Sequence, residues 1–260
     1  IGRLNGIFVP TRNLEFFVHI FLSLPLSQRV IKLALLLGKL MSIFQILTSS
    51  IGRKILMAIT GLLLSFFMAF HLFGNLFLFV GEAAFNGYVQ KLHKLGFLIR
   101  IAEFFLLTFV LSHAYSGILL WWKNRKAKKN VDSYSKENTS SAARYAAFTG
   151  SFIFIFLVTH WATFWYKFNF DMQQGITYYD VVLGSEVGFA NPFFSVFYIV
   201  AIALLGYHLK HGFSSAGQTL GIVGTEYEKL YNNLSIIFWF WIPLGFISIP
   251  VWFGFLVRVI

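Results

Sequence analysis

The stretch ILMAITGLLLSFFMAFHLFGNLFLFV, residues 55–80, decides the class of fold. No Asp, Glu, Lys or Arg interrupts it. At a rise of about 1.5 Å per residue, a helix of this length exceeds the roughly 30 Å of hydrocarbon in a bilayer. We therefore expect residues 55–80 to cross a membrane as an α-helix.

Four further stretches share this apolar character and complete the expected architecture. The chain as a whole is 57% hydrophobic and only 12% charged, which excludes an ordinary soluble domain. Because no open sheet edge can sit in lipid, an all-helical bundle follows. We predict an all-α fold, a transmembrane five-helix bundle within residues 48–260. Its helices are expected at residues 55–80, 101–122, 145–166, 192–212 and 234–257.

Three prolines mark features of these helices. Pro192 stands at the first turn of the fourth helix, where a missing backbone N–H costs nothing. Pro243 and Pro250 fall inside the fifth helix, and we expect them to bend it.

Residues 1–47 have a different pattern. Their apolar runs are interrupted by Pro25, Arg29, Lys32 and Lys39, which fits an interfacial amphipathic helix or a marginal span. A processed signal peptide is less favoured, because the basic n-region is poorly formed. We predict an N-terminal extension that is interfacial or not part of the functional fold.

The charges of the chain predict its orientation. The formal net charge is +11, and the Lys and Arg residues gather beside the apolar spans, at Arg53, Lys54 and Lys123–Lys129. The positive-inside rule places these segments, and the N-terminus of the 55–80 helix, on the cytoplasmic face, here called the inner face. This pattern is a topology signal, so we expect lipid and not nucleic acid as the partner of these charges. The chain contains no cysteine, so any metal must be held by His or carboxylate.

Four of the seven histidines lie one per expected helix. Ionisable groups inside lipid are costly, which makes each of them a functional candidate. His71 lies about 25 Å and His160 about 24 Å from the inner face. His208 lies about 24 Å from the outer face, and His113 about 15 Å from the inner one. His71 therefore shares an outer level with His160, and His113 shares an inner level with His208.

Two histidine pairs at two depths are typical of bis-imidazole ligation of two stacked haems. A bare zinc ion would need three or four ligands at one point. A proton-relay transporter would bring more intramembrane carboxylates than Glu103. A single membrane histidine can also serve only to bond a neighbouring carbonyl. Three glycines follow a histidine by three or four residues and share its helical face: Gly74, Gly117 and Gly212. They would let a flat haem approach the backbone, or they would serve ordinary helix packing.

The residues around the histidines carry a family resemblance. The motifs are AFHLFGN (69–75), LSHAYSG (111–117), VTHW (158–161) and GYHLKHGFSSAGQTLG (206–221), with SIGRK (50–54) and GEAAFN (81–86). They resemble the b558-type cytochrome subunit of succinate dehydrogenase and fumarate reductase over about residues 41–260. The chain is most similar to the five-helix, di-haem, single-polypeptide anchors that work with menaquinone.

This resemblance implies a function and a ligand set. It implies two haem b groups, the distal one held by His71 and His160 and the proximal one by His113 and His208. It implies a flavoprotein and an iron–sulfur protein bound on the cytoplasmic face of a bacterial inner membrane. Electrons would pass between the iron–sulfur protein and a quinone, with menaquinone implied, while succinate would react in the flavoprotein.

Other residues have softer assignments. His211 could replace His208 as ligand or lie near a haem propionate. Arg53, Lys54 and Lys210 could also pair with propionates, or act only as topology anchors. Glu82, just past the outer end of the first helix, is a candidate for proton transfer at a quinone site, although it could equally be a solvated loop carboxylate.

Three further predictions complete this interpretation. His93 is a weaker candidate for the same proton transfer, and we expect no role for His19. The rival functions are a b561-like quinol cytochrome that works without soluble partners, and a haem-free membrane scaffold or transporter.

Overall fold

The computed structural model describes residues 48–128 and 141–257, together with scattered positions between 25 and 45. Most of the predicted extension at residues 1–47, including His19, therefore lies outside the described residues. Lys129, the last residue of the Lys123–Lys129 run, also lies outside them. The chain divides into two compact units, Ile1–Gly52 and Arg53–Ile260.

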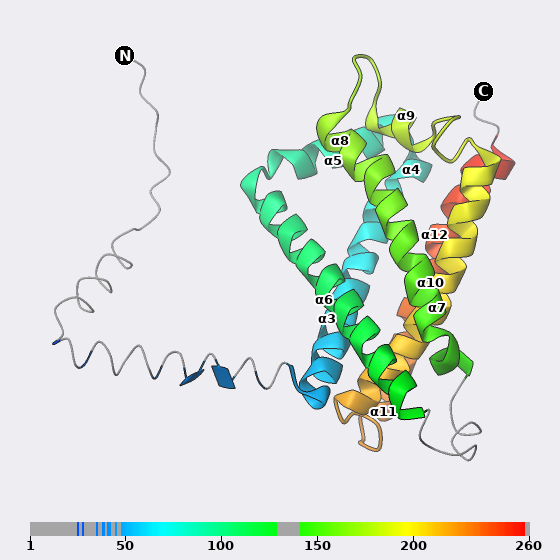
Figure 1. The fold of residues 1–260 in the computed structure, drawn as a ribbon. Coiled ribbons are helices and arrows are strands. Elements are labelled where there is room, and N and C mark those ends of the chain that lie inside the picture. The colour runs from blue at the N-terminus through cyan, green and yellow to red at the C-terminus, as the bar shows by residue number, and fades with distance from the viewer. Residues whose placement is uncertain are drawn as a thin grey trace. The chain divides into compact units, whose positions relative to one another are not determined.

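The described residues form helices and no strands, and five of the helical segments are long and apolar enough to cross a membrane (Figure 1). This confirms the predicted all-α fold with five membrane-spanning helices. The spans are Ser50–Val80, Phe97–Lys123, Tyr145–Phe170, Pro192–Thr219 and Glu228–Leu256.

Several spans are built from more than one helical element. The first consists of α3 (Ser50–Asn75) and α4 (Phe77–Val80), and the second belongs to α6 (Phe97–Lys128). The third joins α7 (Ser141–His160), the π-helical segment η2 (Trp161–Tyr166) and α8 (Lys167–Phe170). The fourth is α10 (Pro192–Thr219). The fifth joins α11 (Glu228–Ile236), η3 (Ile237–Trp241), α12 (Ile242–Val251) and η4 (Trp252–Leu256).

The helices extend past the ends predicted from hydropathy. The second reaches Lys128 instead of residue 122, and the fourth reaches Thr219 instead of residue 212. Hydropathy marks where hydrocarbon ends, whereas a helix ends where its backbone hydrogen bonds stop. Polar residues continue a helix into the interfacial region at little cost, so the two boundaries differ.

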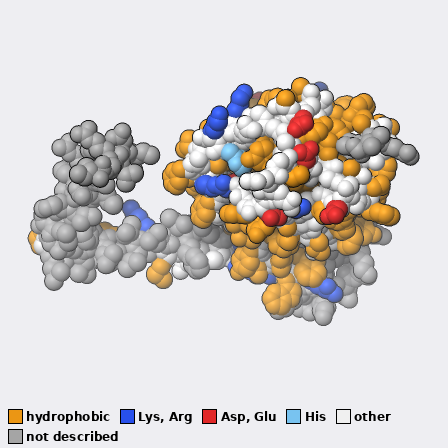
Figure 2. All heavy atoms as spheres, turned by 90° about the horizontal axis from the view of Figure 1, so that it is seen from above, with side chains coloured by type: hydrophobic (Ala, Val, Ile, Leu, Met, Phe, Trp, Pro, Cys, Tyr) orange, Lys and Arg blue, Asp and Glu red, His pale blue; other side chains and the backbone are white. Residues whose placement is uncertain are grey.

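The two ends of the bundle differ in structure. One end, called the inner end after the predicted orientation, carries Arg53, the C-terminus of α6 and α11. The outer end is capped by α5 (Glu82–Lys94), α8 and α9 (Tyr178–Val182) (Figure 1). Figure 2 views the outer end and shows Lys, Arg, Asp and Glu side chains on it, with hydrophobic side chains around the rim. This distribution fits a bundle whose sides face lipid and whose ends face water.

Local sequence features position the fourth and fifth spans. The Asn191 side chain caps α10 by accepting hydrogen bonds from the backbone N–H groups of Phe193 and Phe194, and Pro192 occupies the first turn as predicted. Pro243 follows the π-helical segment η3, and Pro250 precedes η4. The two prolines predicted to bend the fifth helix therefore lie beside π-helical turns. Proline lacks a backbone N–H and so removes one helical hydrogen bond, and the π-helical turns change the local hydrogen-bond pattern.

The core concentrates around α10, which packs against both α7 and α12. Tyr198 and Ala201 of α10 are almost fully buried, as is Ile249 of α12. Helix α3 approaches α12 closely, because a Cβ on Gly245 would lie only 2.7 Å from Leu72 Cδ2. Small residues that allow such close approach are common between membrane helices.

Candidate functional site

The structure brings the four span histidines together in the two pairs that depth predicted. The ring centroids of His71 (α3) and His160 (α7) are 5.7 Å apart, and those of His113 (α6) and His208 (α10) are 6.2 Å apart. The ring planes cross at 90° in the first pair and at 77° in the second. We call them the outer pair and the inner pair. Each pair joins two different spans, so tertiary structure and not local sequence creates each site.

In the inner pair, the contacts of His113 fix which ring nitrogen carries the proton. Its Nδ1 lies 3.2 Å from the backbone carbonyl oxygen of Met57. A carbonyl can only accept, so Nδ1 must be the N–H donor. Thr60 Oγ1 lies 3.3 Å from the same Nδ1, and it donates its own proton to the Leu56 carbonyl at 2.7 Å. Its oxygen therefore also accepts from Nδ1, and the Nε2 lone pair is left available for a metal.

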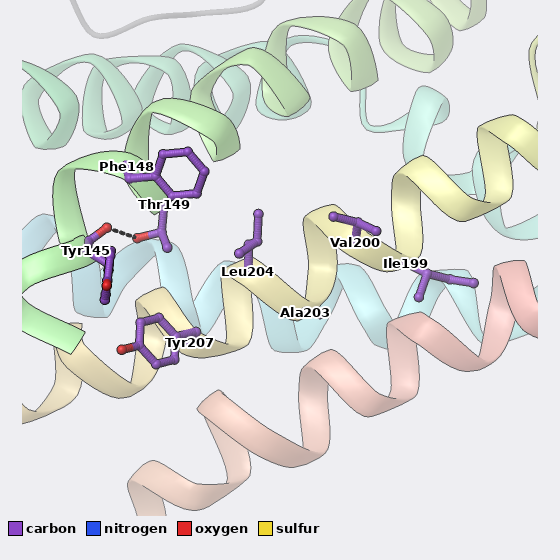
Figure 3. Close-up of a pocket in the computed structure, with 8 residues that line it drawn as sticks. All are labelled: Tyr145, Phe148, Thr149, Ile199, Val200, Ala203, Leu204 and Tyr207. Atoms are coloured by element: carbon purple, nitrogen blue, oxygen red, sulfur yellow. Dashed lines mark hydrogen bonds between the residues drawn. The ribbon is translucent and has the colours of Figure 1, made fainter. Parts of the chain in front are cut away.

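His208 is fixed in the same way by the neighbouring helix. Its Nδ1 lies 3.3 Å from Thr149 Oγ1. That hydroxyl donates to the backbone carbonyl of Tyr145 at 3.2 Å (Figure 3). The Ala146 carbonyl oxygen also lies 3.1 Å from it, which leaves the hydroxyl oxygen available to accept from Nδ1. The hydroxyl lies beside a groove of about 510 Å³ between α7 and α10 that is otherwise mostly apolar. With Nδ1–H donating in this way, both histidines of the inner pair would keep the Nε2 lone pair free for a metal.

The outer pair is held mainly by aromatic packing. The His71 ring stacks on Phe67, with centroids 5.3 Å apart, and lies 5.6 Å from Phe246. The Asn75 amide lies 3.5 Å from His71 Nε2, too long for a strong hydrogen bond. His160 Nδ1 lies 3.2 Å from the hydroxyl of Tyr198, a residue that is 3% exposed. A tyrosine hydroxyl can donate or accept, so this contact does not fix the tautomer of His160.

Both pairs fit the requirements of a bis-imidazole iron site. Metal–imidazole bonds are about 2 Å long, so an iron between two rings places their centroids about 6 Å apart. The observed separations of 5.7 and 6.2 Å are close to this value, and they also lie within the range of ordinary edge-to-face ring contacts. Among the residues that the structure describes, no three His, Cys, Asp or Glu side chains form a group that could hold a bare metal ion. A haem needs only one imidazole on each side of its iron.

A repeated Thr-Gly step, which the sequence analysis missed, supports the inner pair. Thr60-Gly61 of α3 contacts His113, and Thr149-Gly150 of α7 contacts His208. A Cβ on Gly61 would lie 3.0 Å from His113 Cε1, and one on Gly150 would lie 3.5 Å from His208 Cε1. The rings therefore lie directly against these two backbones.

The same two helices also supply the outer pair. Each Thr of the repeat precedes the outer-pair histidine of its own helix, His71 or His160, by eleven residues. Eleven residues are about three turns, or roughly 16 Å, so both features share one face of each helix. In both helices, a Thr-Gly pair is followed by a histidine at the same spacing. This repeat is the sequence signal that could have identified Thr60 and Thr149.

The glycines singled out from sequence have other neighbours. A Cβ on Gly74 would meet the ring of Tyr88, with its hydroxyl oxygen 2.6 Å away, and one on Gly117 would lie 3.9 Å from Met57 Sδ. A Cβ on Gly212 would meet nothing within 4 Å. Of the two uses that the sequence left open, the contact with Tyr88 indicates helix packing for Gly74. Helical spacing alone does not distinguish these two uses of glycine.

Glu82, the candidate for proton transfer, is exposed at the first turn of α5, at the outer end. Its Oε1 lies 3.4 Å from Asn86 Nδ2, and Asn86 Oδ1 accepts a hydrogen bond from the backbone N–H of Tyr179. Burial, and then the Glu82 charge, raise the pKa of Tyr179. Glu82 is thus part of a polar cluster at the outer end, and its role in proton transfer stays a prediction.

His93 lies in the last turn of α5, with its ring 5.4 Å from that of Tyr178. Partial burial, and then the Arg100 cation, lower the pKa of His93, while Glu103 opposes this effect. Its imidazole is therefore neutral near pH 7 and could accept a proton only in more acidic conditions.

The candidate propionate partners are spread over different faces. Arg53 is half-buried and Lys54 is exposed at the start of the Arg53–Ile260 unit. His211 is half-buried on α10, one turn beyond His208. Lys210 lies over the ring of Trp239, with Nζ 4.8 Å from the centroid, on the face of α10 turned away from His208. This position gives no support to Lys210 as a propionate partner, and the other three assignments stay predictions.

Glu103 forms part of a fully bonded cluster at the outer end of α6. Its carboxylate accepts from Arg100 Nη1 at 2.7 Å and from the indole N–H of Trp165 at 2.9 Å. Arg100 also donates to Asn169 at 2.6 Å. These contacts tie α6 to η2 and α8, so the one carboxylate noted inside the predicted spans has a structural explanation.

Comparison of this chain with protein-family models, with curated proteins and with solved structures gave no match. The function of the chain therefore has to be inferred from its histidine pairs and the residues around them.

Proposed function

We propose that this chain is a di-haem cytochrome b, the membrane anchor of a succinate:quinone oxidoreductase. The observation that carries the proposal is the inner pair, in which the Met57 carbonyl contacts Nδ1 of His113 and the Thr149 hydroxyl contacts Nδ1 of His208. Ligand histidines characteristically donate their second ring N–H in this way, which fixes the ring and raises its basicity. A histidine that served only to bond a neighbouring carbonyl would not need a second histidine ring 6.2 Å away.

The residues of the chain would act by holding two haem groups and by orienting the histidine rings that bind them. His113 and His208 would hold one haem b and His71 and His160 the other, at levels about 16 Å apart along the helices. Haem b in such a site supplies one-electron transfer without oxygen chemistry. The Thr-Gly steps support the inner rings, and Phe67, Phe246 and Tyr198 enclose the outer ones.

The partners and the substrate follow from the family resemblance. A flavoprotein and an iron–sulfur protein would bind the cytoplasmic face of a bacterial inner membrane, where the N-terminus of the first span would also lie. Electrons would pass between the iron–sulfur protein and a quinone, with menaquinone proposed. The proton traffic of the quinone would use Glu82, because its exposed carboxylate lies at the outer end of the span that carries His71.

An absorption spectrum of the purified protein tests the central claim. We expect dithionite to produce a sharp b-type alpha band and the haem assay to give two haems per chain. Absence of the band would leave the haem-free scaffold or transporter as the better reading.

Gentle extraction tests the partners separately. We expect flavin and iron–sulfur subunits to copurify with the haem. If the haem-containing chain leaves the membrane alone from cells that express all of its neighbours, the b561-like quinol cytochrome is favoured.

A charge-neutral variant tests the proposed proton group. Glu82→Gln should slow quinone turnover while haem content stays unchanged. The matched control is Glu186→Gln, since Glu186 is also an exposed carboxylate of the segment between the third and fourth spans. Equal turnover in the two variants would return Glu82 to the role of a surface carboxylate.

A further inference from the structure

Lys210 is a cation inside a membrane-spanning helix that the haem sites do not use. It lies nine residues before the end of α10, which corresponds to about 14 Å of helix. Its side chain is exposed, and its Nζ lies 4.8 Å from the centroid of the Trp239 ring. A cation over an indole face is stabilised when water is scarce, and this contact holds the ammonium against the fifth span.

The ammonium stands at the edge of a cavity of about 310 Å³ between α10 and the fifth span. Gly206 allows the two backbones to come close here, because a Cβ at this position would lie 3.0 Å from the Trp239 carbonyl oxygen. Leu244 and Ile247 line the cavity away from the cation. The cavity therefore combines one cationic part with an apolar part, and it opens on a face of the bundle that lipid surrounds.

The charge of Lys210 has no carboxylate to balance it within the described part of the chain. The one ion pair found there joins Arg100 to Glu103 at the outer end. At the inner end, the Glu228 carboxylate accepts from the backbone N–H of Gly224. A lysine near the bilayer interface is stabilised by snorkelling and by anionic lipid, so an anion with an apolar tail would complete this site.

We propose that this cavity binds one anionic phospholipid, with its phosphate at Lys210 and an acyl chain along Leu244 and Ile247. Three features select this ligand. The cation requires an anion, the apolar part requires a hydrocarbon chain, and the exposed position offers both from the surrounding leaflet. A free phosphate would use only the first feature. The proposal does not depend on haem, because Lys210 lies on the face of α10 turned away from His208.

Native mass spectrometry of the intact protein, with any copurifying subunits, tests this site. The probes are phosphatidylglycerol, phosphatidylcholine and inorganic phosphate. We expect one phosphatidylglycerol to bind more tightly than phosphatidylcholine, and Lys210→Met to weaken it about five-fold, the effect of one lysine near an anionic headgroup. Lys210→Arg should retain binding. Lys229→Met is the matched control, since Lys229 is an exposed lysine of α11 that does not line the cavity.

A second variant keeps the test decisive if Lys210→Met fails to fold. Leu244→Trp leaves the cation in place and fills the apolar part, so it should also lower phosphatidylglycerol binding. Unchanged lipid binding in both variants, or equal loss in the Lys229→Met control, would overturn the proposal. Full competition by inorganic phosphate at concentrations comparable to the lipid would identify a simple anion site and would also overturn it.

Discussion

The inner and outer histidine pairs have similar ring separations but are held by different forces. Hydrogen bonds hold the inner pair, because Met57, Thr60 and Thr149 supply acceptors for both Nδ1–H groups. Aromatic side chains hold most of the outer pair, and its single hydroxyl contact comes from Tyr198. Under the proposed function, the inner pair would be organised for metal ligation before a ligand arrives, whereas the outer pair would select its tautomer when one binds.

Under the proposed function, this difference would give one bundle two haem sites with separate properties. Hydrogen bonds to a ligand imidazole tune its basicity, while surrounding aromatic groups control polarity and access. The repeat places a Thr-Gly step and a histidine on one face of both α3 and α7. Each of these helices thus contacts a histidine of the inner pair and supplies a histidine to the outer pair.

The largest effect is expected from removing the histidines themselves. His71→Ala and His160→Ala should each remove the same haem, and His113→Ala and His208→Ala the other. A haem assay combined with a redox titration identifies which haem remains. His211→Ala is the matched control and should retain both haems. Loss of both haems from one substitution, with the fold intact, would contradict the pairing.

A smaller effect on haem binding is expected from Thr149→Val. Valine has nearly the same shape as threonine but lacks the hydroxyl that contacts His208 Nδ1. Loss of such a partner typically lowers affinity about 10–100-fold, so titration of the haem-free protein with haem should show weak filling of the inner site. Thr159→Val is the control, because the Thr159 hydroxyl bonds the Ile155 carbonyl on the same helix and no histidine. Equal weakening in the control would mean that the helix, and not the histidine, was perturbed.

The two Thr-Gly steps should respond differently to an added methyl group. Gly61→Ala places a Cβ 3.0 Å from His113, tighter than ordinary contact, whereas Gly150→Ala places one 3.5 Å from His208. We expect Gly61→Ala to reduce occupancy of the inner site and Gly150→Ala to leave it nearly unchanged. Haem content and thermal stability measure both. A larger loss of haem in Gly150→Ala than in Gly61→Ala would contradict the contacts described around the two rings.

The smallest effect is expected from Tyr198→Phe. This change removes the hydroxyl at His160, makes the ligand less basic, and should raise the potential of the outer haem. One hydrogen bond of about 1 kcal/mol corresponds to roughly 40 mV for a one-electron couple. Tyr207→Phe is the control, since Tyr207 lines the groove between α7 and α10. A shift of the inner potential in Tyr198→Phe would break the proposed separation of the two sites.

Much of the architecture could be predicted from the sequence. The five spans could be predicted from the lengths of the uncharged apolar stretches, because a membrane of fixed thickness needs a fixed run of apolar residues. Counting residues from the span ends gave the depth of each histidine, because the helical rise is constant. The pairs that depth predicted, such as His71 with His160, are the pairs that the structure brings together.

The contacts around the rings could not be predicted in this way. Apolar side chains suit both lipid and the protein interior, so a membrane helix carries little signal of its rotation about its axis. For this reason, the sequence left Lys210 as a candidate for the haem side, while the structure places it against Trp239. The same reason hid Thr60 and Thr149, whose partners lie on other helices.

The sequence by itself determined the class of the protein, the number of spans and the level of each histidine. These follow from one-dimensional quantities, namely charge, hydropathy and distance along a helix. Only the tertiary structure decided which faces meet, and therefore that carbonyl and hydroxyl acceptors fix the tautomers of the inner pair while aromatic rings enclose the outer one. A hydrogen bond to a ring nitrogen depends on the rotation and spacing of two helices, which packing sets.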